Sequence, residues 1–322
     1  MNRDDRIFLA GHRGMVGSAL MRALQREGFK NVVTATRQEL DLRDAKSVKL
    51  FFERERLDCV LLAAAKAGGI QANRQFPADF IYDNLMIQNN VIHQAYLSRV
   101  KQLLFLGSSC IYPRDCPQPM KEEYLMTGPL EPTNEGYALA KIAGVKMAKY
   151  YHEQYGLQSI CPVPCNLYGQ NDSFDPRYSH VVSALVKKFA DAVDEQKEEV
   201  VLWGSGIALR EFLHVDDAAN ALLLLMEKWH SPEIINIGSG RDISIRDLAE
   251  TIAQKVHYTG KVVWDITKPD GMLRKRMDVS KLRALGFNPV VKLKEGIDMA
   301  INEYRSLNAL NTHGPCHTGN PQ

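Results

Sequence analysis

The sequence predicts an α/β fold in which a doubly wound parallel sheet is followed by a smaller C-terminal α/β lobe. Short apolar runs alternate with stretches of helical periodicity through the first half of the chain. A glycine turn follows the first apolar run and opens the first helical stretch. After Pro164 the regular alternation stops. We therefore expect a nucleotide-binding domain over residues 1–165, a substrate lobe over 166–310 and a disordered tail over 311–322.

The composition is that of a folded chain without unusual charge. Its 322 residues are 45% hydrophobic and 24% charged, with a formal net charge of +2, so nothing indicates a nucleic-acid partner. No apolar run approaches the roughly 18 residues of a membrane span, and the polar N-terminus shows no signal-peptide core. Six irregularly spaced cysteines predict neither a disulfide framework nor a metal site, so we expect a cytoplasmic protein.

The first turn has the pattern of a dinucleotide site. A predicted strand, Arg6–Ala10, runs into a glycine turn, and a predicted helix, Ser18–Arg26, follows. Glycines let the backbone approach a pyrophosphate, which then rests on the positive end of the helix. The spacing is Gly-x-x-Gly-x-x-Gly, and the turn comprises Gly11, His12, Arg13, Gly14, Met15, Val16 and Gly17. A glycine turn without a ligand is the alternative.

The end of the second predicted strand, Asn31–Thr36, indicates which dinucleotide binds. An NAD site usually has an acidic residue there to hold the ribose hydroxyls, but here Arg37 follows the strand. Together with Arg13, it would supply several donors to a 2′-phosphate. The sequence thus favours NADP over NAD, unless Arg37 is only a solvated charge at the end of a strand.

Three further elements complete the first half of the sheet. Asp44 is a predicted N-cap for a helix over Ala45–Arg56, and a strand is expected over Cys59–Ala64. The glycine-rich segment Lys66–Asn73 is predicted to be a loop that faces the ligand. A long helix, Ala78–Ser98, then leads to a strand over Gln102–Leu106.

Candidate catalytic residues follow that strand. Ser108 can hydrogen-bond a substrate carbonyl, and Cys110 can act as a base if its thiolate is favoured. The alternatives are that Ser108 only satisfies the backbone and that Cys110 is a small buried hydrophobic residue.

Tyr137 and Lys141 lie one helical turn apart on a predicted helix that ends at Tyr155. A neighbouring ammonium group favours the phenolate, so we expect Lys141 to lower the pKa of Tyr137 and to make it a better proton donor to a developing alkoxide. The pair alone is a weak signal, because most such pairs are ordinary surface residues.

The second half of the chain mixes helices and strands. The fifth strand is expected over Gln158–Val163, and His180 precedes a helix over Val181–Val193. The strand Ile234–Ile237 is predicted to return to the main sheet. The remaining predicted elements are the helices Asp216–Trp229 and Ser244–Val256, the strand Lys261–Trp264 and two closing helices.

Four motifs, in this order, resemble those of the extended short-chain dehydrogenase/reductase family. They are Gly11-x-x-Gly14-x-x-Gly17, Ser108 with Tyr137-x-x-x-Lys141, Asn166-x-Tyr168-Gly169, and Arg210-Glu211-Phe212-Leu213-His214-Val215-x-Asp217. The resemblance covers the chain to about Tyr304. It implies a Rossmann-type nucleotide-binding domain and a homodimer in which the helices Ala78–Ser98 and Tyr137–Tyr155 pack across the two-fold axis.

Within that family, the resemblance implies NADPH-dependent 3,5-epimerisation and 4-keto reduction of GDP-4-keto-6-deoxy-D-mannose to GDP-L-fucose. Ser108, Tyr137 and Lys141 would serve the reduction, and Cys110 and His180 would be the base and the acid of epimerisation. Contacts to the GDP-sugar are implied for Lys188, Trp203, Arg210 and Asp270. Besides the glycine turn and Arg37, contacts to NADP are implied for Leu106, Gly107, Lys141, Pro164, Asn166, Leu167 and His180.

Two alternatives remain open at this point. The same chemistry could act on a related GDP-4-keto sugar of the colitose or 6-deoxy-heptose pathways, or the chain could be a non-catalytic NADP-binding regulator. Cys110 argues against the dehydratases and 4-epimerases of the family, which carry other residues at this position. A pure regulator would need none of the catalytic residues Ser108, Cys110, Tyr137, Lys141 and His180. Cys165 replaces the family's usual Thr near the cofactor. Trp203, without the family, could equally be a core residue.

Overall fold

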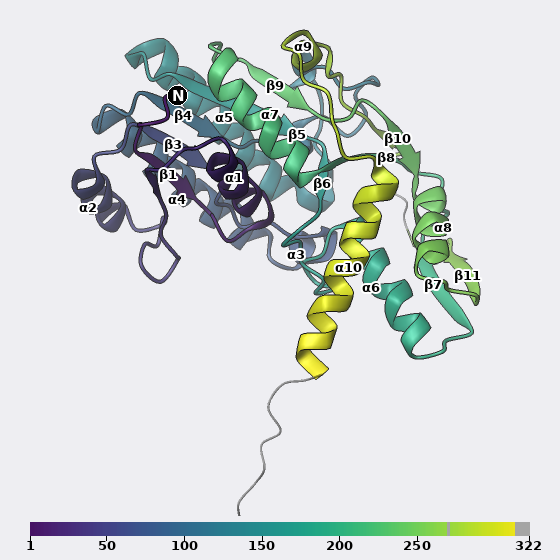
Figure 1. The fold of residues 1–322 in the computed structure, drawn as a ribbon. Helices are drawn as coiled ribbons and strands as arrows, with labels where there is room; N and C mark the ends of the chain where they lie inside the picture. The colour runs from purple at the N-terminus through teal and green to yellow at the C-terminus, as the bar shows by residue number, and fades with distance from the viewer. Residues whose placement is uncertain (269–270, 313–322) are drawn as a thin grey trace, which may run out of the picture.

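The computed structural model describes residues 1–268 and 271–312 and contains a parallel sheet with a second lobe at its carboxyl edge (Figure 1). The sheet has six strands in the order β2-β1-β3-β4-β5-β9, and every neighbouring pair is parallel. Its strands are β1 (Ile7–Ala10), β2 (Val32–Val33), β3 (Cys59–Leu62), β4 (Gln102–Phe105), β5 (Ser159–Pro164) and β9 (Ile234–Ile237). The predicted fold class is confirmed.

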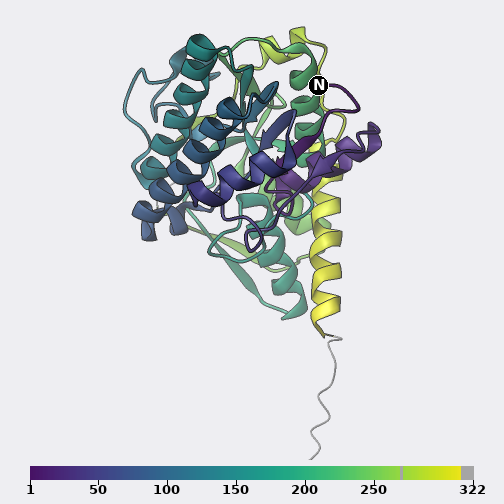
Figure 2. The same cartoon turned by 90° about the vertical axis from the view of Figure 1, so that its left-hand side faces the viewer.

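Helices cover both faces of this sheet, as the predicted alternation requires. On one face α1 (Met15–Arg26) packs against α7 (Val215–Lys228). On the other, α4 (Pro77–Leu97) lies between α2 (Ala45–Glu55) and α5 (Glu135–Tyr155). Figure 2 shows α4 and α5 side by side as the long blue and teal helices. Asp44 caps α2 as predicted, because its carboxylate accepts the N–H groups of Lys46 and Ser47.

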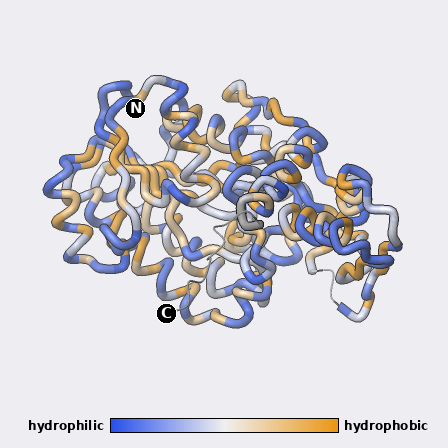
Figure 3. The backbone as a smooth tube through the Cα atoms, turned by 60° about the horizontal axis from the view of Figure 1, so that its bottom comes forward, coloured by the Kyte–Doolittle hydropathy of each residue, from blue (hydrophilic) through white to orange (hydrophobic). Residues whose placement is uncertain are grey.

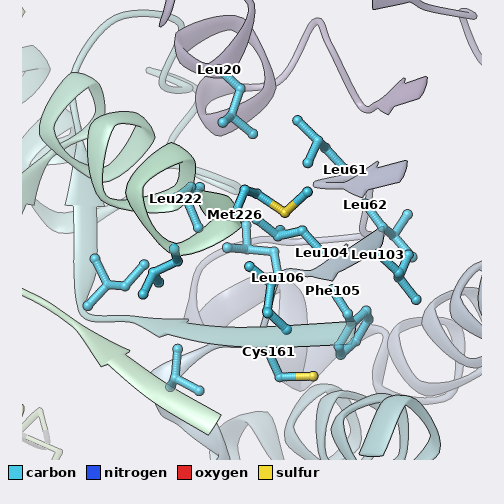
Figure 4. Close-up of a cluster of buried hydrophobic side chains, with 14 of the residues drawn as sticks. Leu20, Leu61, Leu62, Leu103, Leu104, Phe105, Leu106, Cys161, Leu222 and Met226 are labelled. Atoms are coloured by element: carbon cyan, nitrogen blue, oxygen red, sulfur yellow. The ribbon is translucent and has the colours of Figure 1, made fainter. Parts of the chain in front are cut away.

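The interior of the sheet consists of aliphatic side chains from both layers. The side chains of Leu61, Leu104 and Leu222 are at most 1% exposed, and Figure 4 shows them with Met226 from α7. The hydropathy colouring in Figure 3 follows this arrangement, because the strands are largely orange and many outer turns are blue. Such burial supplies most of the free energy that holds the layers together.

The second lobe has its own small sheets and its own hydrophobic cluster. Strand β8 (Leu209–His214) pairs with β6 (Asn166–Tyr168), β10 (Asp242–Ser244) and β12 (Arg274–Lys275), while β7 (Glu199–Trp203) pairs with β11 (Lys261–Asp265). The flanking helices are α6 (Val181–Asp194), α8 (Ile245–Lys255), α9 (Ser280–Ala284) and α10 (Leu293–Thr312). Phe189 of α6, Ile252 of α8 and Ile297 of α10 meet in the cluster.

Three local expectations were wrong. The segment predicted as a loop contains a short helix, α3 (Ile70–Gln75). Strand β2 is only two residues long, because the chain turns away from this edge of the sheet and Glu39 N donates to the Thr36 carbonyl. Helix α10 continues through Thr312, so the predicted disordered tail begins inside a helix; residues 313–322 lie outside the described part of the chain.

Candidate active site

The glycine turn after β1 lies against the end of β3, at the point where the chain order reverses across the sheet. Gly11 has a φ of +88°, and a Cβ there would lie 2.7 Å from the backbone nitrogen of Ala64. A Cβ on Gly17 would lie 2.0 Å from the Gly11 carbonyl oxygen. Neither position can hold a larger residue without moving the backbone.

This turn has free donors for an anionic ligand. Gly14 begins α1 without any side-chain cap, so the first N–H groups of the helix have no intrahelical partner. The buried Nδ1 of His12 also has no partner among the described residues. A pyrophosphate on the helix end would engage such groups, so the turn fits a dinucleotide.

The two arginines predicted for the 2′-phosphate are both exposed, and neither forms an ion pair with any residue of the described chain. Hydrogen bonds from Thr36 hold the pKa of Glu39 below its usual value, and the charge of Arg13 adds to this. Hydrogen bonds from Arg43 lower the pKa of Asp41, and the charge of Arg37 adds to this. Glu39 was missed in the sequence because it stands three residues beyond the end of the predicted strand.

Ser108, Cys110 and Tyr137 come together beyond the end of β4. Ser108 caps the short 3-10 helix Ser109–Ile111, and its Oγ accepts the Cys110 N–H at 3.4 Å. Burial raises the pKa of Tyr137, and a hydrogen bond with the same Ser108 hydroxyl partly opposes that rise. The first turns of α5 pack against this 3-10 helix, which brings the phenol to the strand end. Ser108 therefore contacts the backbone and Tyr137 together.

Lys141 does not lower the pKa of Tyr137, which corrects the prediction. Burial raises the pKa of Tyr137 above its usual value, and burial lowers that of Lys141 to about 8. The Lys141 ammonium donates to the Leu106 carbonyl at 2.8 Å and lies 5.9 Å from the centre of the tyrosine ring. Its charge is therefore directed at the end of β4 and not at the phenol oxygen.

Cys110 is buried, with 7% of its surface exposed, and burial raises the pKa of its thiol. Three neighbours oppose that effect, of which the largest is the positive charge of Lys275, followed by Ser108 and Lys141. Lys275 was not identified from the sequence. It lies on β12 opposite Arg210 of β8, and burial lowers its own pKa.

His180 stands at the N-terminus of α6 and hydrogen-bonds Asp172 through Nδ1 at 2.9 Å. The segment before it packs on the glycines after β3, since a Cβ on Gly69 would lie 3.1 Å from the Ser179 carbonyl oxygen. Phe80 spans from this glycine loop to Tyr137, with the two ring centres 6.3 Å apart. The glycine loop, which was predicted to face the ligand, packs in this structure between the segment before His180 and the Phe80 ring that contacts Tyr137.

The residues predicted to contact a sugar nucleotide lie on the second lobe. Trp203 ends β7 with 67% of its surface exposed, which excludes the core-packing alternative. Lys188 donates to the Val201 carbonyl on the same strand, and burial lowers its pKa. Arg210 donates to the Leu209 carbonyl at 2.8 Å. Asp270 lies outside the described residues.

Glu211 is a third residue to which sequence reasoning gave no role, although it lies within one of the family motifs. It is fully buried, and its carboxylate accepts the N–H groups of Gly240 and Met277, both at 2.6 Å. It therefore ties β8 to β12 and to the turn after β9. Burial raises its pKa to about 7 despite these donors. The sequence feature that could have identified Glu211 is its position as an acidic residue between Arg210 and an apolar run.

No described helix has the length and apolarity to cross a membrane, and the described residues contain no metal-binding cluster. The five cysteines of the described chain are all free, and Cys165 makes only a weak contact to the Asn166 carbonyl oxygen.

Comparison with known proteins agrees with this geometry. Residues 7–238 match the model of the NAD dependent epimerase/dehydratase family. The chain is 53% identical to GDP-L-fucose synthase 1 of Arabidopsis thaliana over 94% of each chain. A GDP-6-OMe-4-keto-L-xylo-heptose reductase from C. jejuni superposes with a TM-score of 0.89, at 37% identity over 96% of this chain and 99% of that one. A GDP-L-fucose synthetase from Naegleria fowleri bound to NADP has a TM-score of 0.87, at 29% identity over 96% of each chain.

Proposed function

Because the chain belongs to the NAD dependent epimerase/dehydratase family, we propose that it is an NADP-dependent enzyme that epimerises GDP-4-keto-6-deoxy-D-mannose at C3 and C5 and reduces its C4 ketone, giving GDP-L-fucose. The observation that carries the proposal is the meeting of Ser108, Cys110 and Tyr137 at the end of β4. A reductase alone needs the serine and the tyrosine; the thiol adds a group that can remove a proton.

The reaction begins with proton removal next to the ketone. A carbonyl at C4 acidifies the hydrogens on C3 and C5, so a single site can serve both epimerisations. Cys110 removes the proton from one face, and His180 returns one to the other face. Ser108 and Tyr137 donate to the enolate oxygen, where negative charge develops. Tyr137 afterwards protonates the C4 oxygen; since its pKa is high in the free enzyme, it is a firmly protonated donor.

NADPH, when bound, supplies the hydride that reaches C4. Gly11, Gly14 and Gly17 would admit its pyrophosphate onto α1, and Arg13 and Arg37 would hold the 2′-phosphate. Lys141, fixed by the Leu106 carbonyl, would face the ribose next to the nicotinamide. The cofactor contacts implied for Gly107, Pro164, Asn166, Leu167 and His180 remain part of this proposal.

The GDP portion is assigned to the lobe that begins at residue 166. Arg210 and Lys188 would pair with the diphosphate, because it carries charge that a guanidinium and an ammonium can share. The exposed ring of Trp203 would stack on the guanine. Asp270 would complete the site, and Lys275 beside Arg210 adds a further positive charge.

A homodimer is proposed from the outer face of α4 and α5. Five large side chains of these helices are exposed: Tyr82 by 62%, Tyr150 by 56%, Leu97 by 54%, Tyr155 by 46% and Leu139 by 45%. Exposed apolar side chains gathered on packed helices are typical of a subunit interface. Analytical sedimentation should show a dimer, and replacing Tyr150 by a charged residue should dissociate it.

The activity is tested by incubating the chain with GDP-4-keto-6-deoxy-D-mannose and NADPH, following absorbance loss and identifying the product by NMR. Oxidation of NADPH with formation of GDP-L-fucose is the expected result. If NADPH is not oxidised with this ketone, the proposed reduction of GDP-4-keto-6-deoxy-D-mannose is refuted. If NADPH is oxidised only with a GDP-4-keto heptose, that related sugar is the substrate. Tyr137→Phe is the matched inactive control, since it removes one oxygen.

Epimerisation is separated from reduction in heavy water. With Tyr137→Phe, we expect NADPH oxidation to be abolished, while deuterium still enters C3 and C5 at a reduced rate because Ser108 remains as a donor to the enolate oxygen. With Cys110→Ser, we expect deuterium entry to fall at least 100-fold, because a hydroxyl is a far weaker base at neutral pH. Undiminished exchange in Cys110→Ser would show that another group is the base.

A further inference from the structure

The side chain of Asp172 is nearly fully buried, with 3% exposed, although no sequence motif marks it. It lies in the loop between β6 and α6, and three donors surround its carboxylate. Oδ1 accepts the N–H of Ser173 at 2.8 Å and faces Nδ1 of His180 at 2.9 Å, while Oδ2 accepts the Ser183 hydroxyl. A carboxylate so surrounded is held in one place by both the loop and the helix that follows.

We propose that Asp172 is a positioning residue that fixes the tautomer and the charge of His180, so that Nε2 of His180 presents a proton to the substrate. This rests on the proposed function, in which His180 returns the proton during epimerisation. An ionised carboxylate can only accept hydrogen bonds, so Nδ1 must carry hydrogen whenever the pair is formed. In the protonated imidazole Nε2–H then points away from Asp172 and is the transferable proton.

The electrostatics of the pair agree with this geometry. The hydrogen bond that His180 donates to Asp172 raises the pKa of His180, against a smaller opposing effect of burial. The imidazole retains 43% of its side-chain surface, so its far edge is open while its Nδ1 edge is covered. A protonated, accessible histidine is what the acid in a two-base epimerisation requires.

Other charged groups also lie near this loop. Glu303 of α10 accepts the Asn171 N–H at 2.7 Å. Burial raises the pKa of Glu303; the charge of Asp172 adds to this rise, and the charge of Arg22 of α1 opposes it. Arg177 is engaged by Asp175 within the loop itself. Among the described hydrogen bonds, only that of Asp172 reaches the imidazole.

Asp172→Asn isolates the charge. The amide oxygen can still face Nδ1–H and Ser173 N–H, and the amide nitrogen can donate to the Ser183 hydroxyl, so the geometry is retained while the negative charge is lost. The matched control is Asp175→Asn, three residues along the same loop, whose carboxylate contacts Arg177 instead.

The first measurement uses the chain without substrate. In ¹⁵N-labelled protein, with the His180 signal assigned by its loss in His180→Asn, we expect the neutral ring to carry hydrogen on Nδ1. Asp172→Asn should lower its pKa by about one unit or more, and Asp175→Asn should leave it unchanged. If the neutral ring carries its hydrogen on Nε2, or if the pKa of His180 is unchanged in Asp172→Asn, the inference is overturned whether or not the proposed activity exists.

The second measurement is the pH profile of deuterium entry into GDP-4-keto-6-deoxy-D-mannose. Since the acid must be protonated, the alkaline fall in rate should begin at lower pH in Asp172→Asn, giving about a tenfold loss near pH 8 and little near pH 6. The variant should add no further loss to His180→Asn. An equal loss at every pH, or an additive loss in the double variant, would assign Asp172 a merely structural role. An unaltered chain that exchanges no deuterium would instead refute the proposed function.

Discussion

Lys141 is expected to cost the folded chain stability, and replacing it by methionine should recover part of that cost. The ammonium is 3% exposed, and burial lowers its pKa from 10.5 to about 8. That change corresponds to about 3 kcal/mol against folding when the group is charged. Methionine has a similar length and no charge. It leaves the Leu106 carbonyl without its donor, a loss of about 1–2 kcal/mol. We therefore expect Lys141→Met to be more stable at pH 7 by about 1–2 kcal/mol.

The pH dependence gives the sharper test. Between pH 8 and 10.5 the unfolded chain keeps a proton on Lys141 that the folded chain has released, so the native protein gains stability with rising pH. The advantage of Lys141→Met should be complete below pH 8 and decline up to pH 10.5. Urea unfolding of both proteins without cofactor, at half-unit steps from pH 6 to 10.5, measures the difference. A variant less stable than the native protein at pH 7, or a difference that does not change with pH, would refute the reasoning.

Three other outcomes are expected. Gly17→Ala should abolish NADPH binding in a fluorescence titration and lower stability by at least about 1–3 kcal/mol, because its Cβ would lie 2.0 Å from the Gly11 carbonyl oxygen. Arg13→Ala combined with Arg37→Ala should weaken NADPH by about 100-fold and leave NADH nearly unchanged, and equal losses would exclude a 2′-phosphate contact. Glu211→Gln should cost about 1–3 kcal/mol near pH 4.5, since its amide NH₂ must face a backbone donor. Burial raises the pKa of Glu211 to about 7, so between pH 4.5 and pH 7 the folded chain keeps a proton that the unfolded chain releases. The native protein therefore loses stability as the pH rises, and the stability difference between it and Glu211→Gln in urea unfolding should shrink up to pH 7.

The parts of the site that the sequence predicts are those fixed by local geometry. Gly11 follows the first strand of a parallel sheet, so its place at the carboxyl edge follows from the order of elements alone. Ser108 follows another such strand, and Tyr137 lies in the first turn of the next long helix. The exposure of Trp203 could not be predicted from residue type, because β7 reads Glu-Val-Val-Leu-Trp without polar alternation, and only the structure shows that it ends on an exposed side chain.

The missing parts depend on contacts between distant segments. Lys275 reaches Cys110 only because a two-residue strand, β12, pairs with β8, and so short a strand leaves no periodic pattern in the sequence. Asp172 meets His180 across an irregular loop. The pKa of Tyr137 was predicted in the wrong direction for a related reason. The spacing placed a cation nearby, but it did not reveal that the phenol would be buried or that the ammonium group would donate to the Leu106 carbonyl instead.

Burial and charge together explain how such a pocket can use a thiol as a base. Burial alone opposes the Cys110 thiolate, yet Lys275 and Lys141 both favour it. The same burial lowers the pKa of each lysine, so in the free protein these ammonium groups lack a compensating negative charge. Ionisation of Cys110 supplies that charge, and transfer of the substrate proton moves it from sulfur to the enolate oxygen beside Ser108 and Tyr137. Because one negative charge stays near the same two cations throughout, little solvent or side-chain reorganisation is needed between the two states. In the proposed mechanism, the stability that Lys141 costs the fold would thus be the electrostatic condition for proton abstraction.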